Sequence, residues 1–340
     1  MDNRILVTGG AGYIGSHTCV ELLNAGYDIA VYDNFINSDP EACARVMQLC
    51  DKAFPVIEGD VRDTAHLTAT LKAHNCKTVV HFAGLKAVGE SSEDPVKYYD
   101  NNVAGSLSLL KAMQAAEATN IVFSSSATVY GEPEFLPYTE DHPLRATNPY
   151  GQTKLMIENI LRDTHSANPQ FRIAILRYFN PCGAHQSGRI GEAPKGVPNN
   201  LMPYIAQVAT GQRDALNIWG NDYPTPDGTG IRDYIHVVDL AKGHVSAIAY
   251  ILEHEGCLEV NLGSGRGASV LEVLKAFSKA VGRDLPSRIK ARRPGDVAAY
   301  YANADKARAL LNWQASRSLD EICADHWRWQ SNNPNGYEGT

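Results

Sequence analysis

The sequence predicts an α/β fold in which a doubly wound parallel sheet carries a smaller C-terminal α/β lobe. In the first half of the chain, short apolar and β-branched runs alternate with segments of helical periodicity, which is the order of strands and crossover helices in a parallel sheet. After about residue 180 the elements shorten and turn residues become frequent. We therefore expect a first domain at residues 1–180 and a second lobe at residues 181–340, leaving open that some segments return to the first domain.

Six apolar runs are expected to form the strands of the first domain. They span residues 4–8, 28–33, 54–58, 78–83, 120–124 and 172–177. Helical spacing follows the first run at residues 13–25, where Gly26 ends the segment. Longer helices are expected at residues 96–116 and 149–164.

The second half of the chain contains fewer clear elements. Strands are expected at residues 215–219 and 258–262, and helices at residues 238–253, 269–281 and 305–311. The turn-rich stretches at 181–200 and 220–230 are loops that we expect to wrap a ligand. The terminal sequence NNPNGYEGT is expected to fray.

Composition excludes several classes of protein. With 31 basic and 38 acidic residues the net charge is −7, which argues against general binding of nucleic acids because phosphate contacts need a basic excess. No apolar run approaches the roughly 18 residues that a membrane span needs. The seven cysteines form no C-x-x-C pair and the 11 histidines form no metal-binding pattern. We expect a cytoplasmic protein without a metal site, a membrane contact or a nucleic-acid partner.

Three glycines mark a turn that predicts dinucleotide binding. Gly9, Gly12 and Gly15 lie between the first strand and the first helix, where glycine lets the backbone approach a pyrophosphate at the positive end of the helix. Asp33 ends the next strand, 18 positions after Gly15, and can accept hydrogen bonds from the ribose hydroxyls while repelling a 2′-phosphate. The turn therefore predicts a Rossmann-type site with a preference for NAD over NADP. A purely structural glycine turn is the alternative.

A tyrosine and a lysine one helical turn apart are the strongest catalytic candidates. Tyr150 and Lys154 share one face at the start of the expected helix 149–164. A nicotinamide enzyme that oxidises an alcohol needs a base, and the ordinary tyrosine pKa of about 10 is lowered by a nearby ammonium group and by the cationic nicotinamide. Ser126, at the end of the fifth strand, can hydrogen-bond the same substrate oxygen. The alternatives are an exposed helix pair and a serine in a turn.

These residues lie in longer stretches by which the chain resembles the extended short-chain dehydrogenase/reductase family, most closely its UDP-sugar 4-epimerases. The stretches are VTGGAGYIGSH (7–17), HFAGLKAVGES (81–91), YYDNN (98–102), FSSSATVYG (123–131), NPYGQTK (148–154), LRYFNPCGAH (176–185), PNNLMPYIAQVA (198–209), GNDYPTPDGTGIRDYIHVVDLA (220–241) and RRPGD (292–296). The resemblance implies that Tyr150 is the catalytic base, that Lys154 holds the nicotinamide ribose and that Ser126 relays hydrogen bonds. It also implies a homodimer formed through the helices near residues 98–116 and 149–164.

The resemblance and the positions of strand ends give a full set of expected contacts. The expected cofactor-binding residues are Gly9, Gly12, Tyr13, Ile14, Gly15, Asp33, Asn34, Phe35, Asn37, Ser38, Asp60, Val61, Phe82, Ala83, Gly84, Lys86, Asn101, Ser126, Tyr150, Lys154 and Phe179. The expected substrate-binding residues are Lys86, Ser126, Tyr150, Asn180, Asn200, Leu201, Asn217, Trp219, Arg232, Arg293, Asp296 and Tyr300. Among them, Arg232 and Arg293 are expected at the pyrophosphate, Asp296 at the uridine ribose and Trp219 against uracil.

The residues after Ser126 favour inversion at C4 over elimination. Related dehydratases carry an Asp-Glu pair there, whereas this chain has Ala127 and Thr128. Without a second acid, the hydride can only return to C4, and its return to the opposite face interconverts UDP-galactose and UDP-glucose. A UDP-N-acetylhexosamine or UDP-uronate 4-epimerase is the alternative, and Tyr300 is expected to fill the space that an N-acetyl group needs. A non-enzymatic NAD sensor of the same fold would not need Tyr150.

Overall fold

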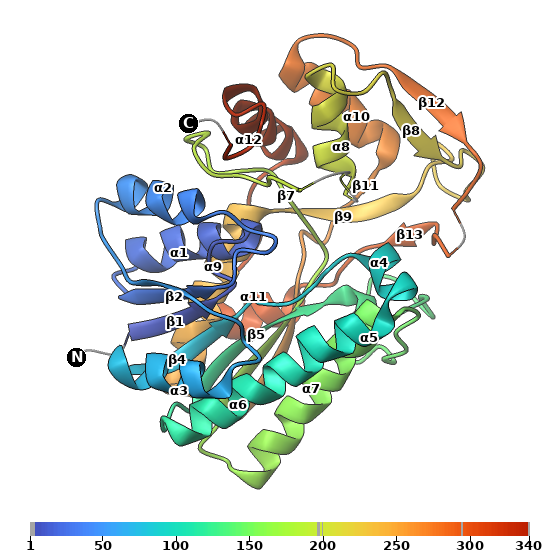
Figure 1. The fold of residues 1–340 in the computed structure, drawn as a ribbon. Coiled ribbons are helices and arrows are strands. Elements are labelled where there is room, and N and C mark those ends of the chain that lie inside the picture. Colours follow the sequence, from blue (N-terminus) through green and yellow to red (C-terminus); the bar gives the residue numbers. More distant parts are fainter. Residues whose placement is uncertain (1–3, 196–197, 199, 294, 339–340) are drawn as a thin grey trace.

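The computed structural model describes residues 4–195, 198, 200–293 and 295–338, and its centre is a parallel sheet flanked by helices on both faces (Figure 1). The sheet has seven strands in the order β10-β6-β5-β4-β1-β2-β3. Their bounds are β1 (Arg4–Thr8), β2 (Ile29–Asp33), β3 (Val56–Glu58), β4 (Cys76–His81), β5 (Asn120–Ser126), β6 (Arg172–Tyr178) and β10 (Cys257–Leu262). The expected α/β fold with a doubly wound parallel sheet is confirmed.

Each strand places alternate side chains on opposite faces of this sheet, and both faces are buried. Ile5 and Val7 point into one core, while Leu6 between them points into the other. The first core is covered by α1 (Tyr13–Asn24), α2 (Pro40–Cys50), α9 (Val237–Glu253) and α11 (Asp305–Leu311). The second is covered by α3 (Thr64–Ala73), α6 (Gly105–Ala115) and α7 (Pro149–Ala167). This alternation fixes which residues of a strand end can reach a ligand.

The helix expected at 96–116 is divided into three segments in the structure. It consists of α5 (Pro95–Tyr98), a π-helical segment η1 (Tyr99–Ala104) and α6. The short helix α4 (Val88–Glu93) precedes it. Apolar periodicity does not reveal a π-helix, and such segments often occur at functional sites.

The smaller lobe lies at the carboxyl ends of the main strands (Figure 1). It contains one sheet of β7 (Asn180–Cys182), β9 (Ile231–His236), β11 (Gly267–Ser269) and β13 (Ala299–Tyr300), and a second of β8 (Leu216–Trp219) and β12 (Ser287–Lys290). Its helices are α8 (Leu201–Ala209), α10 (Val270–Val281) and α12 (Leu319–Asn332). A separate apolar cluster joins these helices to β8 and β9.

Segments from beyond residue 180 also build the main sheet. Strand β10 extends it by pairing with β6, with Cys257 opposite Ile173, and α9 packs on α1. A division at residue 180 remains our proposal, with α9, β10 and α11 assigned to the first domain.

The C-terminal segment is docked rather than frayed, so that expectation was wrong up to Tyr337. The guanidinium group of Arg45 on α2 donates a hydrogen bond to Asn333 Oδ1 over 2.7 Å and lies over the rings of Trp329 and Tyr337. No local pattern in the sequence indicates that α2 binds the C-terminal segment. The described residues contain no candidate membrane-spanning helix.

Candidate active site

The glycine turn at the start of α1 has the shape that an anionic ligand requires. Gly9 has φ of +70°, and a Cβ there would lie 2.7 Å from the amide nitrogen of Ala83. A Cβ on Gly15 would lie 2.3 Å from the carbonyl oxygen of Gly9. The N-cap residue Gly12 provides no side-chain cap, and the first turn of α1 contains no acidic residue. The free amides and the positive helix end therefore suit a pyrophosphate.

Asp33 lies beside this turn with its carboxylate held in place. The side chain is buried, and it accepts hydrogen bonds from the amides of Ala11 and Phe35, both over 3.0 Å, and from Ser38 Oγ over 2.7 Å. Phe35 has φ of 56°, in the left-handed region that a non-glycine residue seldom adopts. The loop after β2 is thus shaped around the carboxylate. A carboxylate fixed next to a phosphate-binding turn fits a ribose with a free 2′-hydroxyl.

The next strand ends contribute a second part of the expected cofactor surface. Asp60 accepts hydrogen bonds from Arg62, which hold the pKa of that carboxyl below its usual value, and Arg62 also pairs with Asp100. Val61 is buried, and Phe82 packs against the ring of His244 with 4.8 Å between centroids.

Sequence reasoning missed Asn102, which shapes the loop after β4. Its side-chain oxygen accepts from the amide of Leu85 over 2.8 Å, and its amide donates to the carbonyl oxygen of Leu85 and to Thr153 Oγ1. Asn102 therefore ties the loop that carries Lys86 to helix α7. Asn102 lies in the π-helical segment η1, and the periodicity of the sequence does not reveal such a segment.

The structure brings the three catalytic candidates together at the carboxyl end of β5. Tyr150 lies in the first turn of α7, which Asn148 caps by accepting a hydrogen bond from the amide of Gly151 over 2.9 Å. The Nζ atom of Lys154 lies 5.9 Å from the centre of the Tyr150 ring. Ser126 ends β5 and is hydrogen-bonded to Tyr150. One face of a helix start and one strand end thus form the site.

Burial is the main cause of the pKa shifts of Tyr150 and Lys154. It raises the pKa of Tyr150, and the hydrogen bond from Ser126 acts in the opposite direction. It lowers the pKa of Lys154 to about 8, against the effect of the Glu158 carboxylate. Tyr150 is therefore a neutral phenol at neutral pH unless further positive charge lies beside it.

A buried ion-pair network beneath these residues was not foreseen. Glu158 and Arg177 are both fully buried, and the Nε and Nη2 atoms of Arg177 donate to the two carboxylate oxygens of Glu158 over 3.0 and 2.7 Å. Ser125, next to Ser126, donates to Glu158 over 2.5 Å. Glu158 follows Lys154 by one helical turn, so the network fixes α7 against β5 and β6. The sequence signal that could have predicted this network is Glu158 itself, a carboxylate on the buried face of the expected helix 149–164.

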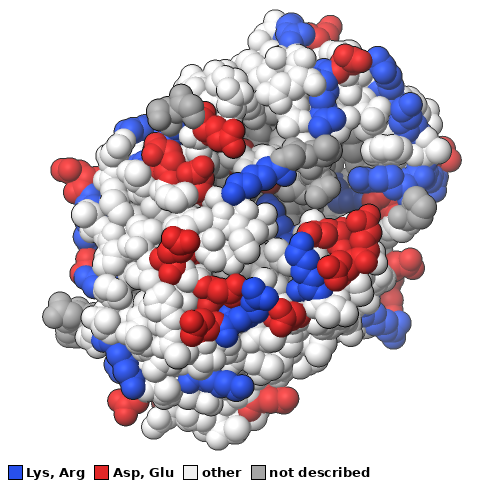
Figure 2. Space-filling model, in the orientation of Figure 1, with Lys and Arg blue, Asp and Glu red and all other residues white. Residues whose placement is uncertain are grey.

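Four expected substrate residues meet at the edge of the second lobe. Asp296 lies 3.5 Å from Arg232 Nη2 and 2.9 Å from Arg293 Nε. The guanidinium group of Arg293 lies over the ring of Trp219, 5.9 Å from its centre. Trp219 is 40% exposed, so its ring is available to a ligand rather than buried in the core. Figure 2 shows basic side chains along the boundary between the two lobes.

Tyr300 connects the catalytic side of the site to this cluster. In β13 it pairs with Arg232 of β9, and its ring packs on Phe179 and Tyr138 with centroid distances of 5.2 and 5.1 Å. Its hydroxyl is buried and has no hydrogen-bond partner among the described residues. Such an unpaired hydroxyl suits a contact with a polar ligand.

For the remaining expected residues, the structure gives a side-chain hydrogen bond or a position in a helix, strand or loop. Tyr13 donates a hydrogen bond to the carbonyl oxygen of Gly183 over 2.7 Å, and Asn217 donates one to Tyr204 Oη over 3.4 Å. The others take their places from the elements that carry them: Ile14 in α1, Asn34 and Asn37 after β2, Gly84 after β4, Asn101 in η1, Asn180 at the start of β7, Asn200 at the N-cap of α8 and Leu201 at its first position. Asn199 and Pro294 of the quoted stretches lie outside the described residues.

The chain is similar to a consistent set of known proteins. The family model described as GDP-mannose 4,6 dehydratase matches residues 6–326. A UDP-glucose 4-epimerase of Bacillus subtilis (strain 168) is 58% identical over 334 residues, covering 98% of each chain, and one of Yersinia pestis is 55% identical over 98% of this chain and 99% of its own. Among solved structures, UDP-glucose 4-epimerase from Bifidobacterium longum in complex with NAD+ and UDP is 54% identical, covers 98% of this chain and 100% of its own, and superposes with a TM-score of 0.95.

Proposed function

The chain belongs to the UDP-glucose 4-epimerases of the extended short-chain dehydrogenase/reductase family, and we propose that Tyr150, Ser126 and Lys154 carry its chemistry. Its reaction is the NAD-dependent interconversion of UDP-galactose and UDP-glucose. The observation that supports the residue roles is the meeting of these three side chains at the end of β5, together with a tight turn that a side chain at position 9 or 15 would block.

The residues that fit NAD are the glycine turn for its pyrophosphate, Asp33 for its adenosine ribose and Lys154 for its nicotinamide ribose. When bound, NAD takes up the hydride of C4 and supplies it again. Asp33 accepts hydrogen bonds from the ribose hydroxyls, and the uncapped amides at the start of α1 donate hydrogen bonds to the phosphates. This assignment follows from the chemistry of the donors and acceptors described above.

Tyr150 is the acid and base of the reaction. Its oxygen takes the proton of the C4 hydroxyl during oxidation and returns it during reduction. Burial keeps the phenol protonated, so ionisation needs the ammonium group of Lys154 and the positive charge of the oxidised nicotinamide nearby. Ser126 Oγ accepts two hydrogen bonds from Thr128, over 3.2 and 3.0 Å, which leaves its own hydrogen free for the C4 oxygen or for Tyr150.

Inversion requires that the sugar turns while the nucleotide stays. The Arg232, Arg293, Asp296 and Trp219 cluster supports a firm hold on the uridine diphosphate. On the sugar side, Ala127 is fully buried and Thr128 is engaged with Ser126, so neither offers an acid for elimination. A 4-keto sugar formed in this site can only be reduced again, on either face.

The packing of Tyr300 favours unmodified hexoses over N-acetylated ones. Its ring fills space between Phe179, Tyr138 and Arg232, where a smaller residue would leave a gap. An assay of purified protein on UDP-galactose, UDP-N-acetylgalactosamine and UDP-galacturonate tests the substrate assignment. Conversion of UDP-galactose with the highest kcat/KM is expected, and a preference for either of the other two would contradict it.

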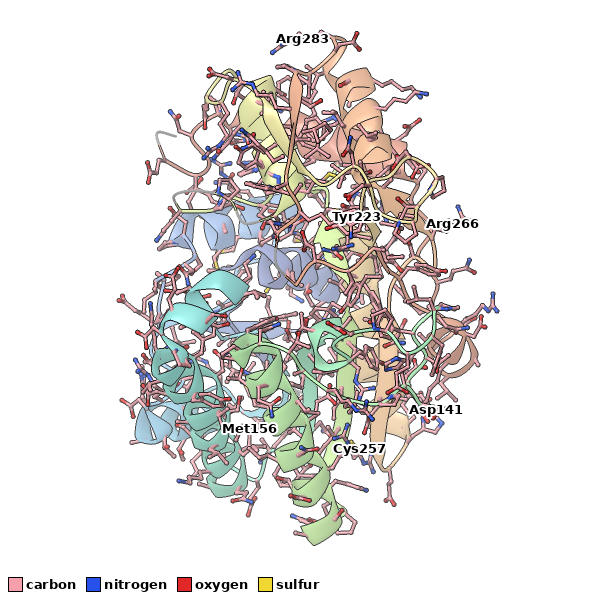
Figure 3. All side chains as sticks on the ribbon, turned by 90° about the vertical axis from the view of Figure 1, so that its right-hand side faces the viewer. Asp141, Met156, Tyr223, Cys257, Arg266 and Arg283 are labelled. Carbon is pink, nitrogen blue, oxygen red and sulfur yellow. The ribbon has the colours of Figure 1, made fainter. Side chains whose placement is uncertain are left out.

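We also propose that two copies of the chain associate through the face formed by α6 and α7. Large apolar side chains are exposed there: Leu107 is 39% and Met156 is 38% exposed. Figure 3 views the molecule from this side and labels Met156 on α7. Light scattering after gel filtration should give a dimer for the wild type and a monomer for Met156→Glu combined with Leu107→Glu. A monomeric wild type would contradict the proposal.

The seven cysteines support a reducing compartment. All of them are free thiols, and five are buried in the cores. We infer a cytoplasmic location, which fractionation of the source cells would test.

A further inference from the structure

A buried carboxylate lies where the two lobes meet. Glu192 belongs to the connection between β7 and α8, and its side chain is only 5% exposed. Carboxylates are rarely buried to this extent unless they are paired. The backbone here is fixed by α12, because Trp329 Nε1 donates to the carbonyl oxygen of Glu192 over 3.0 Å. Gly191 permits this contact, since a Cβ at that position would lie 2.3 Å from the Trp329 ring.

One oxygen of this carboxylate joins two residues from opposite sides of the site. Glu192 Oε1 accepts hydrogen bonds from Lys86 Nζ over 3.3 Å and from Asn200 Nδ2 over 3.1 Å. Lys86 lies on the loop after β4 of the main sheet, whereas Asn200 occupies the N-cap position of α8 in the smaller lobe without making a side-chain cap. Both are expected to bind the UDP-sugar. Glu192 therefore links the main sheet to the substrate lobe through two expected ligand-binding residues.

The other carboxylate oxygen of Glu192 has no partner in the part of the chain that the structure describes, so the charge of this carboxylate is balanced by Lys86. Glu192 Oε2 is buried and has no hydrogen-bond partner among the described residues. The neighbouring His326 does not supply a positive charge, because burial lowers its pKa to about 4 despite the opposing effect of Glu192. The ion pair recorded for Glu192 in the described part of the chain is the one with Lys86. The buried charge of Glu192 thus holds the Lys86 ammonium at this place.

We propose that Glu192 is a positioning residue, which holds the Lys86 ammonium and the Asn200 amide in register for the diphosphate of the UDP-sugar. The inference rests on the proposed function and deepens it. Lys86 remains 64% exposed in its side chain, so its ammonium can contact Glu192 and a phosphate oxygen together. Without Glu192, a flexible lysine and a helix-cap amide must be ordered by the substrate itself, which weakens binding.

The expected effect lies in KM rather than in kcat. Glu192→Gln keeps the volume and one acceptor oxygen but removes the charge, and should raise KM for UDP-galactose about 10-fold. The value of kcat should stay within about threefold, because Tyr150, Ser126 and Lys154 are not in contact with Glu192. Glu255→Gln is the matched control, since Glu255 is 81% exposed and lies outside the site, and it should behave as the wild type.

A double-mutant cycle separates positioning from a general loss of structure. Lys86→Met should raise KM, and adding Glu192→Gln should change KM less than twofold further, because the second residue acts through the first. The same addition should raise the melting temperature of Lys86→Met, since it neutralises a buried carboxylate that has lost its cation. Asn200→Ala provides a second variant, at a helix end. Glu192→Gln keeps an acceptor for the Asn200 amide and acts through Lys86, so its effect on KM should be additive with that of Asn200→Ala.

The outcomes are distinct. A wild type that does not convert UDP-galactose would refute the proposed function itself. If the wild type converts UDP-galactose, additive KM changes in the Lys86 cycle would overturn the role of Glu192. So would a Glu192→Gln variant whose KM stays within twofold of the wild type, or whose kcat falls more than its KM rises. If Glu192→Gln does not fold alone, its double variant with Lys86→Met is compared with Lys86→Met. A KM within twofold of Lys86→Met supports the role of Glu192, and a larger increase contradicts it. An Asn200→Ala variant with the wild-type KM would also contradict it.

Discussion

The ammonium group of Lys154 donates a hydrogen bond to the carbonyl oxygen of Ser124 over 2.7 Å. This contact attaches the first turns of α7 to the end of β5, two residues before Ser126. The Ser125–Glu158 hydrogen bond forms a second attachment one turn further along the same helix. The distance between Tyr150 and Ser126 is therefore set by the scaffold and not by the ligand.

The first prediction concerns Tyr150. Tyr150→Phe removes the ionisable oxygen and keeps the ring, so kcat should fall by about 10²–10⁴-fold. KM for UDP-galactose should change little, because we propose that Arg232, Arg293 and Trp219 hold the nucleotide. Steady-state kinetics of the two proteins provide the measurement. A variant that keeps half of the wild-type kcat would refute the role of Tyr150.

The second prediction concerns the glycine turn. Gly15→Ala places a Cβ 2.3 Å from the carbonyl oxygen of Gly9 and should disrupt the turn, so the purified variant should contain little NAD. Gly89→Ala is the matched control, because a Cβ at Gly89 in α4 meets no atom within 4 Å. NAD released by acid and quantified per chain gives the comparison. Equal NAD content in both variants would contradict the assignment of the turn.

The third prediction concerns the size of the sugar. Tyr300→Cys removes the ring that packs on Phe179 and Tyr138, and should raise kcat/KM for UDP-N-acetylgalactosamine relative to UDP-galactose about 10-fold or more. The ratio is measured with both substrates on both proteins. An unchanged ratio would show that Tyr300 does not limit the pocket.

The fourth prediction concerns pH and Lys154. Burial lowers its pKa from 10.5 to about 8 in the folded protein, so between these values the unfolded chain binds more protons than the folded one. The free energy of unfolding should therefore rise with pH from about 8 to 10.5 relative to Lys154→Met, by about 2–3 kcal/mol. Below pH 8 the difference between the two proteins should be constant. Urea unfolding at several pH values checks this, and parallel curves across the interval would contradict the shift.

Local signals in the sequence predict six of the seven strands of the main sheet and the catalytic candidates, whereas β10 was expected in the second lobe. Hydrophobic periodicity marks β1 and α1, and the Gly9–Gly15 spacing with Asp33 marks a dinucleotide turn, because both depend on neighbouring residues only. Asn102, Glu158 and Glu192 were missed because their roles depend on partners far along the chain, at Thr153, Arg177 and Lys86. The docking of the C-terminus on Arg45 was missed for the same reason.

Isotope retention at C4 tests the central claim most directly. UDP-galactose carrying deuterium at C4 should be converted by the purified wild-type protein, with no NAD added, to UDP-glucose that keeps the deuterium at C4. In the proposed mechanism the hydride leaves and returns within one enzyme complex, while Tyr150 exchanges only the hydroxyl proton. Mass spectrometry and proton NMR of the product provide the measurement. Replacement of the deuterium by solvent hydrogen, or release of one NADH per product, would contradict the account.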